Sequence, residues 1–185
     1  MAKFCPECGT PTIKIQDGEK MLDACPDAHF ITIDETAAGV GALVFRNDEV
    51  LLVERQYPAG LWSLPRGWIQ HGETLSQAIE REVLEETAIV IQAKGILSVS
   101  IRSTQSRNEL YIVFLCQYVS GDPVPDMKEV SQVRFVHPDK MDDLDLSEFD
   151  RGLIANYIVH TPDVLGEMDA LASIPAVTTY AFKGS

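Results

Sequence analysis

The stretch GWIQHGETLSQAIEREVLEETAIVI, residues 67–91, contains five glutamates within fourteen positions. Its apolar residues recur at helical spacing from Leu75 to Val83, and Thr74 or Ser76 stands where a helix cap is expected. We therefore predict a helix that begins at about residue 75.

Three carboxylates would share one face of this helix, because residues three and four positions apart lie on adjacent turns. They are Glu82, Glu85 and Glu86, with Arg81 as the only nearby cation in the stretch. Like charges so placed destabilise a helix unless something neutralises them. Taken alone, the cluster is either a solvated acidic face or a set of oxygen ligands for Mg²⁺ or Mn²⁺.

The residues around the carboxylates follow a fixed spacing. The constrained positions are filled by Gly67, Glu73, Arg81, Glu82, Val83, Glu85, Glu86 and Ile89. This pattern resembles the Nudix box, G-x5-E-x7-R-E-U-x-E-E-x-G-U with U aliphatic, and a chance match at so many positions is rare. The departure is Ala88, where the family usually has Gly, and a left-handed cap there would cost Ala about 1 kcal/mol.

The resemblance implies an enzyme, a metal-dependent Nudix pyrophosphohydrolase that cleaves a nucleoside diphosphate linked to another group. The metal ligands that it implies are Glu82, Glu85, Glu86 and the backbone carbonyl of Arg66, with Glu129 added by its place before a late strand. The catalytic residues that it implies are Glu73, Arg81, Glu82, Glu86 and Glu129. Within this set Glu73 and Arg81 would brace the loop-helix-loop. Metal ions would neutralise the pyrophosphate and activate a water, while Glu82, Glu86 or Glu129 takes its proton.

The flanking segments predict a mixed sheet between helices, an α+β or α/β chain. Residues 40–45 and 49–55 read as a hairpin, and residues 56–68 as a loop without regular structure, since this segment contains two prolines and two glycines. The further strands are expected at 89–100, 110–119 and 133–136, and helices at 138–144 and 147–160. The resemblance implies a Nudix-type α/β/α sandwich over residues 37–160, followed by a C-terminal extension, 161–185.

Residues 1–32 hold three of the four cysteines and are too few to build a hydrophobic core. Cys5, Cys8, Cys25 and His29 have a spacing typical of a structural Zn²⁺ site, although a metal-free ribbon stays open. The segment resembles the zinc ribbon that precedes the catalytic domain in a subset of Nudix hydrolases, including NADH pyrophosphatases. Cys116 lies in an apolar run and is expected to be a core thiol.

The loop beside the box offers three aromatic rings, Tyr57, Trp62 and Trp68, to stack on a base or to anchor the loop. With Arg66 and Gly67 they form the expected substrate-binding set. The ribbon resemblance favours a dinucleotide-like pyrophosphate such as NADH, FAD or ADP-ribose, although the SQPWPFP-type segment of NADH pyrophosphatases is absent. The alternative is a catalytically weak nucleotide sensor or regulatory binding module on the same fold.

A net charge of −13 opposes contact with nucleic acid and anionic membranes. No apolar run reaches the roughly 20 residues needed to span a bilayer, and the first ten residues, MAKFCPECGT, are not a hydrophobic signal. We therefore expect a cytoplasmic protein whose partner is a nucleotide-derived small molecule, not a nucleic acid or a membrane. A homodimer is compatible with the resemblance, because dimers are common in the family.

Overall fold

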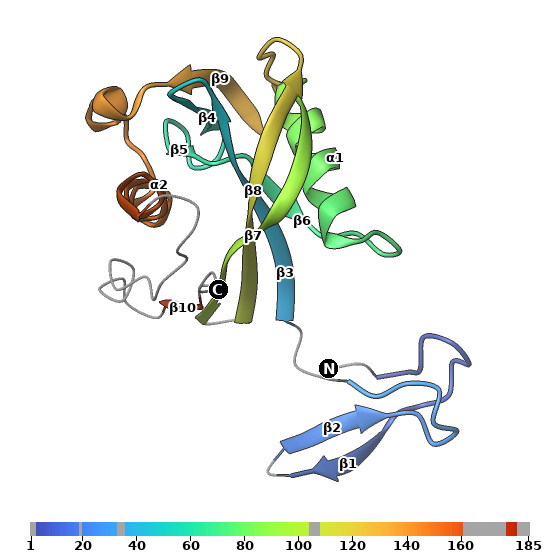
Figure 1. Ribbon diagram of the computed structural model, residues 1–185. Coiled ribbons are helices and arrows are strands. Elements are labelled where there is room, and N and C mark those ends of the chain that lie inside the picture. The colour runs from blue at the N-terminus through green and yellow to red at the C-terminus, as the bar shows by residue number, and fades with distance from the viewer. Residues whose placement is uncertain (1–2, 19, 33–35, 104–107, 161–176, 181–185) are drawn as a thin grey trace. The chain divides into compact units, whose positions relative to one another are not determined.

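The computed structural model describes residues 3–18, 20–32, 36–103, 108–160 and 177–180 (Figure 1). The chain forms two compact units, Met1–Glu35 and Thr36–Ser185. The boundaries expected from the sequence, at 32, 37 and 160, stay predictions. Most of the expected C-terminal extension lies outside the described residues.

The smaller unit is a two-stranded hairpin with short loops. Strand β1 (Ile13–Asp17) pairs antiparallel with β2 (Lys20–Ala24). Its buried apolar residues are few, namely Cys5, Leu22, Ala24 and Cys25 among those described. So small a core cannot supply the free energy of folding on its own.

The larger unit contains one mixed sheet (Figure 1). Its strands are β3 (Thr36–Arg46), β4 (Glu49–Arg55), β5 (Trp62–Ser63), β6 (Arg66–Trp68), β7 (Val90–Ser103), β8 (Asn108–Ser120), β9 (Val130–Val136) and β10 (Val177–Tyr180). The order is β10-β7-β8-β3-β4-β5, with β6 paired to β3 and β9 paired to β4. Strands β3 and β8 run parallel, and the other pairings between described strands are antiparallel. The predicted mixed sheet is confirmed.

Helices cover both faces of this sheet, because the buried residues of β3 alternate between two cores. On one face helix α1 (Leu75–Thr87) packs on the strands through Val40, Ala42, Val44, Ala78, Ile79 and Val83. On the other face lie the 3-10 helix η1 (Pro138–Asp143) and helix α2 (Glu148–His160), packed through Leu43, Val50, Leu52, Met141, Leu153 and Ile154. The α/β/α sandwich is therefore confirmed. None of the helices in the described part is both long and apolar enough to cross a membrane.

The segment 56–68 differs from the prediction of an irregular loop. It contains the short strands β5 and β6, which pair with β4 and β3. Strand β5 has two residues and β6 has three, with Pro65 between them. The hydrophobic periodicity of the sequence therefore gives no signal for either strand. The pairing is set by the neighbouring strands and not by local sequence. It fixes the backbone that leads into the box.

Both ends of α1 are capped. The Thr74 hydroxyl accepts from the Gln77 N–H at 3.2 Å, and the Gln77 side chain accepts from the Thr74 N–H at 2.9 Å, which is a capping box. Thr74 is thus the cap among the two candidates. At the other end Ala88 is left-handed, with φ 57° and ψ 14°, and its N–H donates to the Leu84 carbonyl. The strain expected at Ala88 is present.

Replacing Ala88 by Gly is expected to stabilise the larger unit by about 0.5–1 kcal/mol. The left-handed conformation costs an alanine about 1–2 kcal/mol, and the extra freedom of unfolded Gly offsets about 0.4–1 of this. Ala88 is exposed, so no buried contact is lost. Thermal unfolding should show Tm raised by about 1–4 °C. Ala59→Gly, at an exposed turn residue without positive φ, is the control and should bring no gain.

Candidate functional site

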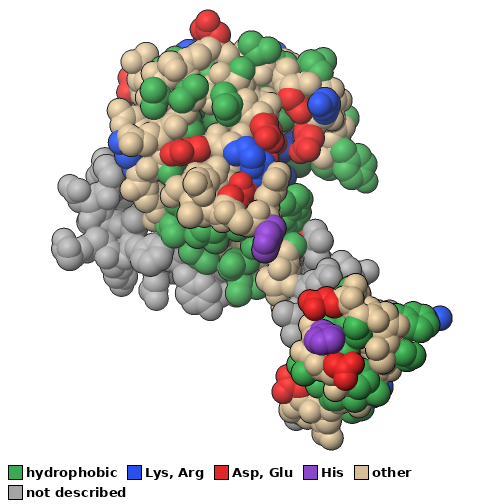
Figure 2. Space-filling model, turned by 90° about the vertical axis from the view of Figure 1, so that its right-hand side faces the viewer, with side chains coloured by type: hydrophobic (Ala, Val, Ile, Leu, Met, Phe, Trp, Pro, Cys, Tyr) green, Lys and Arg blue, Asp and Glu red, His purple; other side chains and the backbone are tan. Residues whose placement is uncertain are grey.

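Two of the box carboxylates lie on the buried side of α1. The Glu86 residue is only 2% exposed and Glu82 is also buried, whereas the Glu85 side chain is 60% exposed. Figure 2 shows acidic side chains gathered beside basic ones on one face of the larger unit. Buried carboxylates of this kind need hydrogen bonds and counter-charges. The burial of Glu82 and Glu86 therefore argues against the interpretation of this cluster as a solvated acidic face.

The loop before the helix lies directly against these carboxylates. A Cβ atom built on Gly67 would come within 2.0 Å of the Glu82 carboxyl carbon, so a larger residue there would displace the Glu82 carboxylate. The Arg66 N–H donates to Glu86 Oε2 at 3.0 Å. The structure thus brings Arg66, Gly67, Glu82 and Glu86 together.

Arg81 and Glu73 form a two-bonded ion pair. Arg81 Nε donates to Glu73 Oε2 at 3.0 Å, and Nη2 donates to Oε1 at 2.8 Å and to the Trp68 carbonyl at 3.1 Å. The same guanidinium donates through Nη1 to Glu82 at 2.6 Å and to Glu85 at 3.2 Å. Arg81 therefore links the loop, the start of the helix and two box carboxylates. This geometry supports the bracing role carried over from the family.

Arg55 is a site residue that the sequence did not single out. Although buried at the end of β4, it forms an ion pair with Glu86 through Nη1. It also donates to the Ser63 hydroxyl at 3.1 Å and to the Arg66 carbonyl at 3.2 Å. Arg55 thus contacts two of the groups that the family resemblance assigns to metal. The available signal was a lone cation two residues after the apolar run of residues 50–53.

The buried carboxyl groups of Glu82 and Glu86 are hard to ionise when no metal ion is bound. Burial, with a smaller contribution from the charge of Glu82, raises the pKa of Glu86 to about 7 against the opposing effects of Arg55 and the Arg66 N–H. Burial also raises the pKa of Glu82, which Arg81 lowers while Glu85 and Glu129 raise it. Because the carboxylates repel one another, an additional positive charge among them would favour the ionised forms of Glu82 and Glu86.

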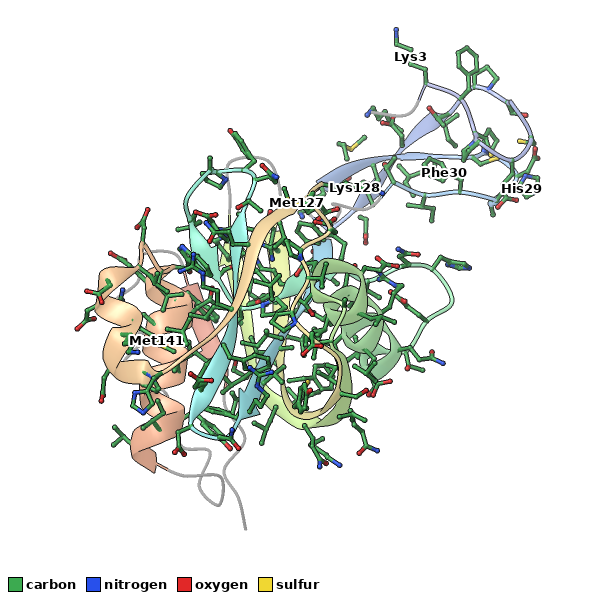
Figure 3. All side chains as sticks on the ribbon, turned by 90° about the horizontal axis from the view of Figure 1, so that it is seen from above. Lys3, His29, Phe30, Met127, Lys128 and Met141 are labelled. Atoms are coloured by element: carbon green, nitrogen blue, oxygen red, sulfur yellow. The ribbon has the colours of Figure 1, made fainter. Side chains whose placement is uncertain are left out.

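Glu129 lies on the loop between β8 and β9, on which Figure 3 labels Met127 and Lys128. Glu129 is exposed, and its backbone carbonyl accepts from the Gln56 N–H at 2.8 Å. The Asp126 carboxylate accepts from the Glu129 N–H at 3.1 Å, which orders the loop. The charge of Glu129 raises the pKa of Glu82, so its side chain belongs to the same electrostatic cluster.

The three loop aromatics differ in exposure. Trp62 is 5% exposed and packs in the core on the α2 face, with Arg134 5.3 Å from its ring centre. Tyr57 is 91% exposed and Trp68 is 51% exposed. Trp62 therefore anchors the loop, and the rings with surface available for a base belong to Tyr57 and Trp68.

A second cluster lies in the smaller unit. One ligand atom from each of Cys5, Cys8, Cys25 and His29 lies within 4.8 Å of all the others. The Cys8 and Cys25 sulfurs are 3.6 Å apart, and Cys25 Sγ is 3.9 Å from His29 Nδ1. Figure 3 shows His29 on its loop next to sulfur atoms.

The chemistry of this donor set fits a divalent metal. Hydrogen bonding with the Thr10 hydroxyl and backbone, and with His29, lowers the pKa of Cys8 to about 6. The thiolate is the form that binds metal. Three sulfurs and one imidazole nitrogen are the donors of a closed tetrahedral site. All four cysteines of the chain are free thiols.

Comparison with known proteins agrees with the fold and the box. A family model described as NUDIX domain matches residues 35–157. Among solved structures, a NUDIX hydrolase from Nitrosomonas europaea superimposes with a TM-score of 0.71 at 26% identity, over 86% of this chain and 92% of that one. The NUDIX domain of Shewanella oneidensis NrtR shares the fold, with a TM-score of 0.59 at 23% identity, over 75% and 94% of the chains.

Curated relatives with a named activity are also similar to the chain. The Pseudomonas syringae pv. tomato protein named NAD-capped RNA hydrolase NudC is 28% identical over 158 residues, which is 85% of this chain and 54% of that protein. The Salmonella schwarzengrund protein of the same name is 31% identical over 141 residues, which is 75% and 53%. The chain spans about half the length of these relatives.

Proposed function

Because the chain belongs to the Nudix hydrolase family, we propose that it hydrolyses the pyrophosphate bond of a dinucleotide-like substrate with divalent cations. The observation that carries the proposal is the convergence of buried Glu82 and Glu86 on the backbone of Arg66 and Gly67. These groups bring two buried carboxylates and backbone oxygen and nitrogen atoms together in one place. Such a site suits a hard cation that takes carboxylates and phosphates together.

The proposed metal ligands are Glu82, Glu85, Glu86, Glu129 and the Arg66 carbonyl, for Mg²⁺ or Mn²⁺. Oxygen donors alone are present, which fits these ions. When bound, the ions supply charge neutralisation and an activated water. Arg81 holds Glu82 and Glu85 in place, and Arg55 holds Glu86 and the Arg66 carbonyl. Glu82, Glu86 and Glu129 stay open as the proton acceptor.

The proposed substrates are NADH, FAD and ADP-ribose. The relatives named for NAD-capped RNA support a pyrophosphate that joins two nucleosides. The net charge of −13 favours a small substrate over a polynucleotide. Tyr57 and Trp68 are the proposed stacking surfaces for a base, beside the backbone of Arg66 and Gly67.

For the smaller unit we propose one structural Zn²⁺, bound by Cys5, Cys8, Cys25 and His29. The close approach of their ligand atoms supports it. Free thiols of this kind persist in a reducing compartment, which supports a cytoplasmic location. A homodimer stays a prediction.

The activity is tested by incubating the full chain with NADH, FAD, ADP-ribose and NAD-capped RNA, with Mg²⁺, with Mn²⁺ and with neither. We expect mononucleotide products from at least one small dinucleotide, separated by chromatography, and only when a divalent cation is present. Capped RNA as the preferred substrate would contradict the proposed exclusion of nucleic acid. Tight nucleotide binding without turnover would replace the proposal with the sensor alternative.

A further inference from the structure

A buried polar cluster lies on the α2 face of the sheet, on the side opposite to α1. It includes Asp150, which is fully buried in the first turn of α2, and the Tyr111 hydroxyl on β8. Among the described residues, Asp150 Oδ1 and the Tyr111 hydroxyl are buried without a hydrogen-bond partner. Unpaired buried polar atoms are costly, so their retention calls for an explanation.

The Tyr111 side chain can lie over β3, next to the loop that leads into the box, because residue 41 of β3 is a glycine. A Cβ atom built on Gly41 would come within 2.0 Å of the Tyr111 hydroxyl, so this side chain lies over Gly41. Gly41 pairs with Arg66 of β6. Cross-strand partners point to the same face of a sheet, which places the Arg66 side chain on the side of Tyr111.

The start of α2 is also bonded directly to the chain that leads into the loop. The Leu64 N–H donates to Asp150 Oδ2 at 3.4 Å. The Trp62 N–H donates to the Asp145 carbonyl at 2.8 Å, and the Ser147 N–H donates to the Trp62 carbonyl at 2.9 Å. Residues 62–64 are thus hydrogen-bonded to the segment at the start of α2. Arg66, two residues further on, is hydrogen-bonded through its N–H to Glu86 of α1.

Asp150, Tyr111 and Arg66 also influence one another electrostatically. Burial raises the pKa of Asp150, and the positive charge of Arg66 acts in the opposite direction. Asp150 and Tyr111 in turn raise the pKa of Arg66 against the effect of its burial. The charge of Asp150 on α2 thus acts on the Arg66 guanidinium together with that of Glu86 on α1, while the Arg66 backbone belongs to the site beside Glu86.

We propose that Asp150 is a positioning residue, which with Tyr111 fixes Leu64 and Arg66 and thereby the backbone oxygen and N–H that Arg66 presents to the box carboxylates. The inference rests on the proposed function, since it assumes that this backbone forms part of a cation site. The competing explanation is that Asp150 only stabilises the first turn of α2, as an acidic residue does at a helix start.

The test uses binding of Mn²⁺ to the zinc-loaded full chain, followed by the electron paramagnetic resonance signal of free Mn²⁺. Glu86→Gln defines which binding belongs to the box. We expect Asp150→Asn to weaken Mn²⁺ binding about tenfold or more, as is typical when a partner of a metal ligand is removed. Tyr111→Phe should weaken it less and in the same direction.

The matched control is Leu153→Ala, since Leu153 is fully buried on the same helix and packs on the same face. It should lower the melting temperature without weakening Mn²⁺ binding. Unchanged Mn²⁺ affinity in Asp150→Asn, with a melting temperature lowered as in Leu153→Ala, would overturn the positioning role. If Asp150→Asn does not fold, Tyr111→Phe decides in the same way. Absence of Glu86-dependent Mn²⁺ binding in the unaltered protein would overturn the proposed function and this inference together.

Discussion

Replacing Glu86 by Gln should lower the rate of pyrophosphate hydrolysis about a thousandfold or more, with the fold intact. Loss of one cation ligand removes several kcal/mol of charge stabilisation, and about 4 kcal/mol corresponds to three orders of magnitude in rate. Gln can still accept a hydrogen bond from Arg55 or from the Arg66 N–H. The measurement is kcat at saturating Mg²⁺, together with thermal unfolding.

Stability should fall by little, because Glu86 is costly to ionise in the metal-free protein and this offsets part of the loss of its ion pair with Arg55. Its pKa is raised to about 7, above the ordinary value of 4.5, so the folded state is destabilised by the ionised form as the pH rises above 4.5. A neutral Gln avoids this cost, and at pH 8 the variant should unfold at a temperature no lower than that of the unaltered protein by more than a few degrees.

Glu80→Gln is the matched control for this change. Glu80 lies on the same helix at an unconstrained position of the box, and its carboxylate accepts from the Ala93 N–H at 3.0 Å. Gln can make the same hydrogen bond, so activity should be kept. Near-normal hydrolysis by Glu86→Gln, with Glu80→Gln also active, would show that the ligand assignment is wrong.

Replacing Cys25 by Ser is expected to unfold the smaller unit while the larger unit stays folded. The few buried residues of the hairpin cannot offset its conformational entropy, whereas a structural Zn²⁺ contributes about 10–16 kcal/mol. Metal analysis should find one zinc per chain before the substitution and none after it. Amide hydrogen exchange should then show loss of protection in β1 and β2 only.

Cys116→Ala serves as the control, because Cys116 is a buried thiol in the core of the larger unit. Burial raises its pKa to about 12, so it is no thiolate ligand at neutral pH. This variant should keep its zinc. A purified protein without zinc, whose hairpin remains protected from exchange after chelator treatment, would instead support a metal-free ribbon.

The box helix could be predicted from the sequence because its signals are local. Apolar spacing from Leu75 to Val83 and the cap at Thr74 depend on residues within a few turns of each other. The fold class followed from the order of elements and the resemblance. The departure at Ala88 raised a left-handed helix end as one case, and the structure shows that conformation.

The partners of the box residues could not be predicted, because they depend on pairings between distant strands. Arg55 reaches Glu86 only after β4, β5 and β6 are assembled beside α1. The contact of Asp150 with Leu64 joins residues 86 positions apart. Trp62 carries the same aromatic signal as Tyr57 and Trp68, and only the packed core shows that it is an anchor.

The parallel pairing of β3 with β8 has a consequence for synthesis and folding. Its pairs run from Thr36 with Asn108 to Phe45 with Gln117, and the box helix lies within the intervening chain. Contacts of such long sequence separation form slowly, since a large loop must close first. Until β8 has been translated, the apolar strand β3 lacks a neighbour on that side, and this unpaired edge exposes the nascent chain to aggregation.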